Sequence, residues 1–430
     1  MQFEFKLFLI LAPVFVFLFF LSQTKKLWLT VITSLFLLSI STITILNIAK
    51  YIYHNYDRPP EWDFLVFWLD GHVAIKGENF YNPQSYQNMS LPYDPDNSFK
   101  DEIINVGFKY PPFAMFLFMS LGLLNISRAY LIWQILNLLL SLGCIYWLWK
   151  LFLNEYGLLS FLLIAALLFR LTPAFNTFYF AQTNFIALFI FLVFWKNRSK
   201  TWSGILLTLG IMVKPYMGIL YLYPILKKNW GMLWVTILSL LLLLCSSLVV
   251  FGLDVFQDFF INITSKVPVY LYTEAVNQSI LAAILRANQN QIVQGPQLLN
   301  PLYLAISLTL SLITGWVAVK NIRINDTWVI LSILFLALIV YPATLQHYST
   351  FLILPVVLLL QQARQQNIGQ RIITLCTILI IYVLSGNETG NFTLAANIFT
   401  WLICIMFSLN LFQKQANKIK VPLSSLELER

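Results

Sequence analysis

Charged residues are scarce in this sequence. They make up 10% of its 430 residues, whereas hydrophobic residues make up 59%, and the mean hydropathy is +0.75. A soluble domain carries about 25% charged residues because it needs a hydrated surface. This chain has too little charge to cover itself in water, so we expect an integral membrane protein with many spans.

Several signatures of catalysis or metal binding are also missing. The chain has no glycine-rich phosphate loop, no nucleophile elbow, and no HExxH or CxxC motif. Its four cysteines lie inside apolar runs without zinc-ligand spacing, and we expect them to act as small packing residues. The nearest approach to a metal-binding DxD motif is Asp94-Pro-Asp96, which is more simply a turn. We therefore predict no metal site and no cofactor.

The net charge of +9 does not indicate a nucleic-acid partner. The basic residues form short clusters between apolar runs, which is typical of the positive-inside rule rather than of a nucleic-acid-binding patch. The expected partners are membrane lipids and lipid-borne substrates.

What the sequence has in abundance is apolar runs near the roughly 20 residues that cross a bilayer. The clearest are Leu27–Ile48, Met232–Phe251, Pro301–Val319 and Leu394–Phe412. A first run, Leu7–Ser22, could be a secretory signal, but it lacks a small-residue cleavage site and leads into another span, so we predict a retained helix. The sequence predicts one all-α membrane domain, residues 1–430, with roughly 11–13 transmembrane helices.

Basic residues indicate which connections face the cytoplasm. The clusters are Lys25-Lys26, Lys196/Arg198/Lys200, Lys227-Lys228, Lys320/Arg323, Arg364/Arg371 and the Lys414/Lys418/Lys420 tail. Nine of the eighteen acidic residues lie in one long connection, residues 49–112, and three more lie in residues 252–300. We expect both connections to be extracytoplasmic loops of functional importance, and residues 413–430 to form a cytoplasmic tail.

If every apolar segment crossed the membrane once, some basic clusters would fall on the wrong side. Some segments must therefore enter and leave the membrane on the same side. Between the first long loop and the Lys196 cluster, one segment must enter and return on one side. Leu158–Phe180, interrupted by Arg170, Pro173 and Asn176, fits this best. Ser203–Ile225 has cytoplasmic lysines at both ends, so we predict two short helices that meet at Lys214-Pro215. Such a break is tolerated only inside protein or a water-filled cavity, which predicts that Lys214 faces a cavity.

Ionisable residues beside the spans are the strongest functional signals. A charge at membrane depth costs roughly 2.5–3.5 kcal/mol, so it persists with a function or a partner. Lys214 could bind a ligand or snorkel to the interface, and His347 could be an ordinary interfacial histidine. Arg286 follows Asn277-Gln278 on an amphipathic segment, and Arg170 could join the same pocket or snorkel.

The stretch EWDFLVFWLDGHVAIKGENFYNP brings acids next to the spans. Asp63 and Asp70 fall two helical turns apart on one face. Asp63 also precedes an apolar run, where it could simply cap a helix that Gly77 ends. This spacing places a carboxylate at the start of a helix lying on the outer membrane surface.

This stretch, followed by FKYPPFAMFLFMSLGLL, resembles the start of the polyprenyl-phosphate-sugar-dependent membrane glycosyltransferases of family 87. That family belongs to the GT-C fold class and includes mycobacterial lipid mannosyltransferases. Four further segments are similar in the expected order: FAQTNFIALFIFL, SGILLTLGIMVKPYMGILYLYPILKKNW, VNQSILAAILR and YPATLQHYSTFLILP. The chain departs from the family pattern at Phe67-Trp68-Leu69-Asp70, where tyrosines and alanines are common, and at Ala181, where glycine precedes the glutamine.

The resemblance implies a GT-C-like bundle that transfers a mannose-like hexose from a polyprenyl phosphate to a hydroxyl of a lipid or glycan, outside the cytoplasm. The catalytic base of the family carries over onto Asp63. The residues fit this chemistry, because an attacking hydroxyl needs one base, while an already ionised phosphate leaving group needs cations but no acid. Inversion is expected from a single displacement.

The remaining candidates follow from these motifs. We expect Lys214 and Arg286 to hold the donor phosphate, with Lys109 and His347 as weaker candidates. The expected substrate ligands are Asp70, which competes with Asp63 as the base, and Tyr110, Gln182, Asn184, Asn277 and Gln278.

Two other functions remain open from the sequence. A transporter would share the many spans and the buried lysine, but transporters usually have short loops and a site midway through the bilayer. A lipid-linked polysaccharide polymerase is the nearest enzymatic alternative.

Overall fold

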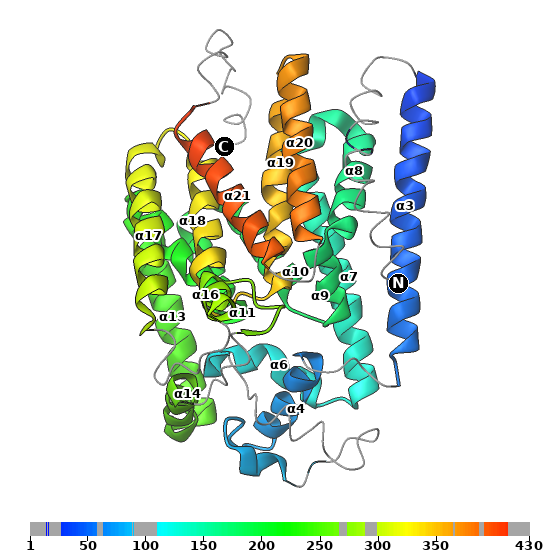
Figure 1. Cartoon of the computed structure of the whole chain (residues 1–430). Helices are drawn as coiled ribbons and strands as arrows, with labels where there is room; N and C mark the ends of the chain where they lie inside the picture. Colours follow the sequence, from blue (N-terminus) through cyan, green and yellow to red (C-terminus); the bar gives the residue numbers. More distant parts are fainter. Residues whose placement is uncertain are drawn as a thin grey trace.

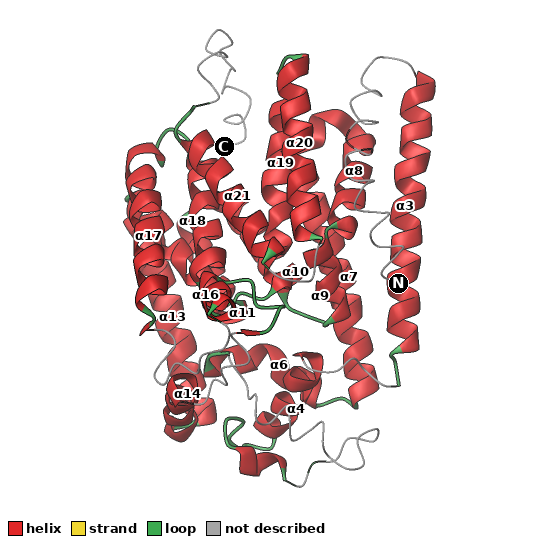
Figure 2. Cartoon of the chain, in the orientation of Figure 1, coloured by secondary structure: helices red, strands yellow, loops and turns green. Residues whose placement is uncertain are grey.

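The computed structural model describes residues 14, 16, 27–57, 63–87, 89, 110–265, 273–288, 299–363, 366–386 and 391–411. Most of the predicted first helix and the predicted tail lie outside these ranges, as do residues 58–62, 88 and 90–109 of the first long loop, which include Asp94, Asp96 and Lys109. Within them the chain forms helices and no β-strand (Figure 2). The prediction of an all-α membrane protein is confirmed.

Seventeen α-helices are described, together with short 3₁₀ and π segments. The α-helices are α3 (Leu27–His54), α4 (Asp63–Ile75), α6 (Met115–Gly122), α7 (Ile126–Leu148), α8 (Gly157–Arg170), α9 (Thr172–Tyr179), α10 (Asn184–Asn197), α11 (Gly204–Val213), α12 (Leu222–Leu226), α13 (Trp230–Phe251), α14 (Leu253–Ser265), α16 (Ile280–Ala287), α17 (Pro301–Asn321), α18 (Asp326–Val340), α19 (Ile353–Ala363), α20 (Ile368–Ser385) and α21 (Phe392–Ser408). The shorter segments used below are η1 (Pro83–Tyr86), η3 (Trp149–Leu153), η6 (Pro215–Tyr221) and η8 (Gln346–Leu352).

Five helical segments of the described chain are long and apolar enough to cross a membrane, and six shorter apolar helices accompany them. Asparagine side chains mark where several spans begin. Asn125, Asn229 and Asn300 each accept hydrogen bonds from backbone N–H groups in the first turn of the next helix. These caps satisfy donors that have no partner within the helix, so the sequence itself sets these boundaries.

Basic residues meet at one end of the bundle, called here the basic end. Asp326, at the start of α18, bonds Arg198 beyond α10 at 3.2 Å and Lys227 beyond α12 at 3.4 Å. Asn325 donates to the Phe407 carbonyl, which brings the end of α21 to the same place. Helices α4, α6 and α14 lie at the opposite end, drawn at the bottom of Figure 1. The molecule therefore has a basic end and an opposite end that contains helices of both long connections, α4 and α14, together with α6.

The segment that does not cross differs from the one we expected. Leu171 is extended and separates α8 from α9, but Tyr179 at the end of α9 stacks on Tyr51 in the last turn of α3, with ring centroids 5.4 Å apart. Residues 158–180 therefore reach the end of α3 that leads to α4, and α10 returns to the basic end. Instead α6, about 12 Å long, is too short to cross and packs along α4. The prediction that Leu158–Phe180 enters and returns on one side is therefore wrong. With α6 as the segment that does not cross, the number of crossings agrees with the sides expected for the basic clusters.

The predicted break in Ser203–Ile225 is confirmed. Helix α11 ends at Val213, Lys214 has an extended backbone (φ −145°, ψ 108°), and η6 begins at Pro215. Proline has no N–H to continue the helix and disfavours a helical conformation in the residue before it. The break therefore follows from the sequence.

Two glycines allow α4 and α6 to pack at backbone contact. A Cβ on Gly71 would lie 2.5 Å from the Phe118 carbonyl oxygen, and a Cβ on Gly122 would overlap the backbone of Gly71 and His72. Across the same contact, Trp68 donates through its indole N–H to the Leu124 carbonyl, and His72 Nδ1 donates to the Gly122 carbonyl, both at 3.0 Å. This packing fixes α4, and with it Asp63, against the bundle.

Gly122→Ala should therefore lower the stability of the protein. The methyl group has no space, and separating α4 from α6 should cost about 1–3 kcal/mol. The measurement is the melting temperature of the detergent-purified protein. Gly315→Ala is the matched control, because a Cβ there meets nothing within 4 Å. Equal behaviour of the two variants would contradict this account of the α4–α6 contact.

Candidate active site

Lys214 is fully buried at the break between α11 and η6. Its Nζ donates to the Tyr110 hydroxyl and to Gln182 Oε1, both at 3.0 Å, and lies 3.9 Å from the centroid of the Tyr348 ring. Hydrogen-bond acceptors and an aromatic face thus surround the ammonium group, without a direct ion pair to a carboxylate in the described part of the chain.

Asp63 joins Lys214 through Gln182. Asp63 is the first residue of α4 and is partly buried, and its carboxylate lies close enough to the Gln182 side chain for that amide to favour the ionised form. Gln182 Oε1 accepts a hydrogen bond from Lys214, so this amide lies between the acid and the base. Burial raises the pKa of Asp63 above its ordinary value, and the Gln182 side chain and the Lys214 charge offset only part of that increase. Three segments far apart in sequence form this group.

Several tyrosine side chains lie near Lys214. The Tyr110 ring packs edge-on against Phe67 of α4, with ring centroids 5.7 Å apart. Tyr216 lies beside Tyr348, with ring centroids 5.4 Å apart. An aromatic wall with hydroxyl groups can both stack on a sugar and hydrogen-bond it.

The NQS segment lies against the segment that contains His347. Gln278 N donates to the Thr344 carbonyl at 2.6 Å, and Gln346 N donates to the Val276 carbonyl at 2.8 Å. The side chain of Asn277 donates to the Pro342 carbonyl, and Gln278 Oε1 accepts from the Leu394 backbone N–H. Both amides therefore hold the backbone of this junction.

His347 is buried in η8 and close enough to Lys214 to experience its charge. Its ring lies against Phe180 and Tyr348, with centroids 5.7 and 5.0 Å away. Its Nε2 is buried and makes no hydrogen bond within the described structure. The structure thus groups Asp63, Tyr110, Gln182, Lys214 and His347.

Comparison with sequence models of protein families matches residues 108–355, more than half of the chain, to Glycosyltransferase family 87. The chain belongs to glycosyltransferase family 87. No match was found among curated proteins or among solved structures. The matched range includes Tyr110, Gln182, Lys214 and His347, whereas Asp63 precedes it. This protein is therefore a membrane glycosyltransferase, and the resemblance found in the sequence is confirmed at the level of the family.

Other predicted residues of this family 87 glycosyltransferase lie apart from the group. Arg286 donates to the Glu274 carbonyl at 2.6 Å and also bonds Asn391. Asn184, at the start of α10, donates to Thr177 Oγ1 at 3.1 Å. No contact joins Arg286 or Asn184 to Lys214 among the described residues, so their ligand roles stay predictions. Lys109 lies outside the described residues.

Ala181 adopts a left-handed backbone conformation, with φ +49°. It directly precedes Gln182, and its carbonyl accepts a hydrogen bond from the Trp133 indole at 2.6 Å. Alanine is strained here by about 1 kcal/mol, because its Cβ crowds the carbonyl that glycine would leave free. The departure from the family pattern at this position is thus a site of strain that positions Gln182.

Ala181→Gly should keep transfer activity and leave the melting temperature equal or higher, since relief of strain offsets the greater freedom of glycine in the unfolded chain. Ala181→Val should lower both, because a β-branched residue fits this conformation poorly. Thermal unfolding and transfer assays of the two variants test this. A loss of stability in the glycine variant equal to that in the valine variant would contradict it.

Sequence reasoning missed Tyr348 and Tyr216, which lie next to residues that it did select. Tyr348 follows His347, and Tyr216 is one residue beyond the Lys214-Pro215 break. Aromatic residues are so common in this chain that adjacency alone gave no signal, and only folding places the Tyr348 ring beside the Lys214 ammonium group and Tyr216 beside Tyr348.

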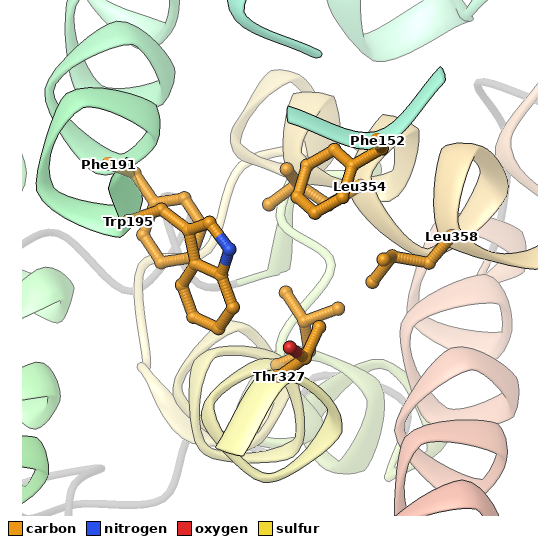
Figure 3. A pocket seen from close by; sticks show the side chains of 7 residues that line it. Phe152, Phe191, Trp195, Thr327, Leu354 and Leu358 are labelled. Carbon is orange, nitrogen blue, oxygen red and sulfur yellow. The ribbon is translucent and has the colours of Figure 1, made fainter. Parts of the chain in front are cut away.

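A small apolar pocket lies away from these residues, between η3, α10, α18 and α19 (Figure 3). Its lining is Phe152, Phe191, Trp195, Thr327, Leu331, Leu354 and Leu358. It contains no acid or base, so it offers no chemistry for sugar transfer. Among the described residues, no three His, Cys, Asp or Glu side chains gather as metal ligands would.

Proposed function

We propose that this protein transfers a hexose, mannose-like, from a polyprenyl phosphate sugar to a hydroxyl group of a lipid or glycan. The observation that supports the proposal is the position of Gln182, whose Oε1 accepts a hydrogen bond from buried Lys214 and whose side chain lies near the Asp63 carboxylate. A carboxylate and a cation in one site are what a displacement with an anionic leaving group requires.

In the proposed reaction the acceptor oxygen attacks the anomeric carbon while the bond from that carbon to the phosphate oxygen breaks. The acceptor proton passes to Asp63, and the bonding pair leaves on polyprenyl phosphate. An ammonium group carries three N–H donors, of which Tyr110 and Gln182 accept two, so Lys214 has one for a phosphate oxygen. His347 Nε2 can provide a second contact. A single displacement inverts the anomeric centre.

The face of the membrane is part of the proposal. Asp63 begins α4, at the end of the bundle opposite the basic end (Figure 1). Basic connections stay in the cytoplasm under the positive-inside rule. The site would then open on the extracytoplasmic side of the cell membrane, where lipid-linked donors replace nucleotide sugars.

The test is incubation of membranes containing the protein with polyprenyl phosphate mannose labelled in the sugar. We expect label in an extractable lipid or glycan, with the opposite anomeric configuration to the donor, and far less label with the Asp63→Asn variant. Transfer only from a nucleotide sugar would overturn the donor assignment. Retained configuration would overturn the single displacement.

A further inference from the structure

Asp70 lies two turns beyond Asp63 on α4 and is nearly inaccessible, with 3% of its surface exposed. Its Oδ1 is bonded to the Tyr86 hydroxyl, and that hydroxyl is also 2.7 Å from the Phe80 carbonyl oxygen. Asp70 Oδ2 has no hydrogen-bond partner within the described chain. Asp70 therefore belongs to a buried chain of three oxygens that is separate from Asp63.

The number of protons shared by these three oxygens determines whether Asp70 is protonated. A carbonyl oxygen can only accept, so the Phe80 carbonyl needs the single proton of the Tyr86 hydroxyl. The second hydrogen bond, between Tyr86 and Asp70, then needs a proton from Asp70. An ionised carboxylate would instead leave one of the two close oxygen pairs without any proton.

Burial favours the same state. A carboxylate taken out of water with one oxygen unpartnered is costly, whereas a neutral acid is much less so. Burial raises the pKa of Asp70 well above its ordinary value, and the hydrogen bond to Tyr86 offsets this only in part. The other titratable groups that act in this cluster are the hydroxyls of Tyr81 and Tyr86.

The chain of contacts continues to the proposed active site. Tyr81, next to Phe80, donates its hydroxyl proton to the Tyr110 carbonyl at 2.5 Å. The side chain of Tyr110 in turn accepts a hydrogen bond from Lys214. The turn formed by residues 80–86 is thus tied to Asp70 at one side and to Tyr110 at the other.

We propose that Asp70 is a neutral, protonated carboxyl group that positions Tyr110, and through it Lys214, and that it is not a second base. This inference rests on the proposed function for its effect on transfer, but not for the protonation state. Asp70 is a positioning residue, because its contacts are to Tyr86 and not to the proposed substrate site.

Two variants separate this role from that of a base. Asp70→Asn keeps a neutral donor of the same shape, so transfer at saturating donor should stay within about threefold of wild type with an unchanged pH profile. Asp70→Ala removes the donor and should reduce transfer about 10- to 100-fold through misplacement of Lys214. Tyr86→Phe, which breaks the same chain, should resemble the alanine variant.

The protonation state is measured without activity. Infrared difference spectra of the purified protein at neutral pH should contain the C=O band of a protonated carboxyl group, which Asp70→Asn removes. Absence of that band overturns the proposal. So does inactivity of a folded Asp70→Asn variant, or an alanine variant as active as wild type. Unimpaired transfer by Asp63→Asn would instead refute the proposed function and leave the infrared result standing.

Discussion

Asp63→Asn should reduce sugar transfer about 10²- to 10⁴-fold, the range that a general base contributes. The amide keeps the size of the side chain but cannot take the proton of the acceptor hydroxyl. The measurement is the initial rate of product formation from labelled polyprenyl phosphate sugar by purified protein in lipid. Donor affinity should change little, because Asp63 is proposed to act on the acceptor.

The matched control is Asp254→Asn, which removes an exposed carboxylate from α14 at the same end of the bundle. Its activity should equal that of wild type. Comparable melting temperatures of both variants would show that the protein remains folded. Normal turnover by Asp63→Asn would remove this residue as the base.

The pH dependence of sugar transfer should reflect the ionisation of Asp63. Asp63 acts as a base only when ionised, so the rate should fall as the pH drops through its pKa. Because burial raises that pKa, the loss should begin above the ordinary 3.8 of an aspartate. Rate profiles of wild type and Asp63→Asn test this, since the residual activity of the variant should lack this acid limb.

Lys214→Met should reduce transfer about 10²- to 10³-fold, as expected when one group that stabilises developing charge is removed. Methionine fills a similar volume, and burying an ammonium group is unfavourable in itself, so the melting temperature should not fall. Transfer kinetics at varied donor concentration measure the loss of activity, and thermal unfolding measures any loss of stability.

Lys200→Met is the control for loss of one positive charge, since Lys200 is exposed beyond α10. It should transfer sugar at the wild-type rate. If Lys214→Met unfolds the protein, or if folded Lys214→Met keeps its full rate, a structural role for this lysine would explain the site better than a phosphate contact.

Local physics made several features predictable. Runs of apolar residues predicted helices α3, α13, α17 and α21, because a backbone in hydrocarbon must satisfy its own hydrogen bonds. Proline after Lys214 predicted the break between α11 and η6. The spacing of Asp63 and Asp70 predicted one helix carrying both, which is α4. These are properties of neighbours along the chain.

The sequence could not say which short apolar segment fails to cross. Helices α6 and α8 are both strongly apolar, so hydropathy does not show which of them crosses the membrane. The glycine contact that packs α6 along α4 decides this, and it joins residues about 50 positions apart. It also left Asp63 and Asp70 as competitors, because burial and partners, not spacing, set the state of a carboxyl group.

The sequence by itself determined that this is a polytopic α-helical membrane protein of family 87, with an acid at the start of one helix and a lysine at a helix break. Tertiary structure decided which of these groups act together. Gln182 lies between Asp63 and Lys214, and the Tyr348 ring lies against the Lys214 ammonium group. Contacts between segments that are far apart in the sequence depend on the packing of the whole bundle, which no local pattern encodes.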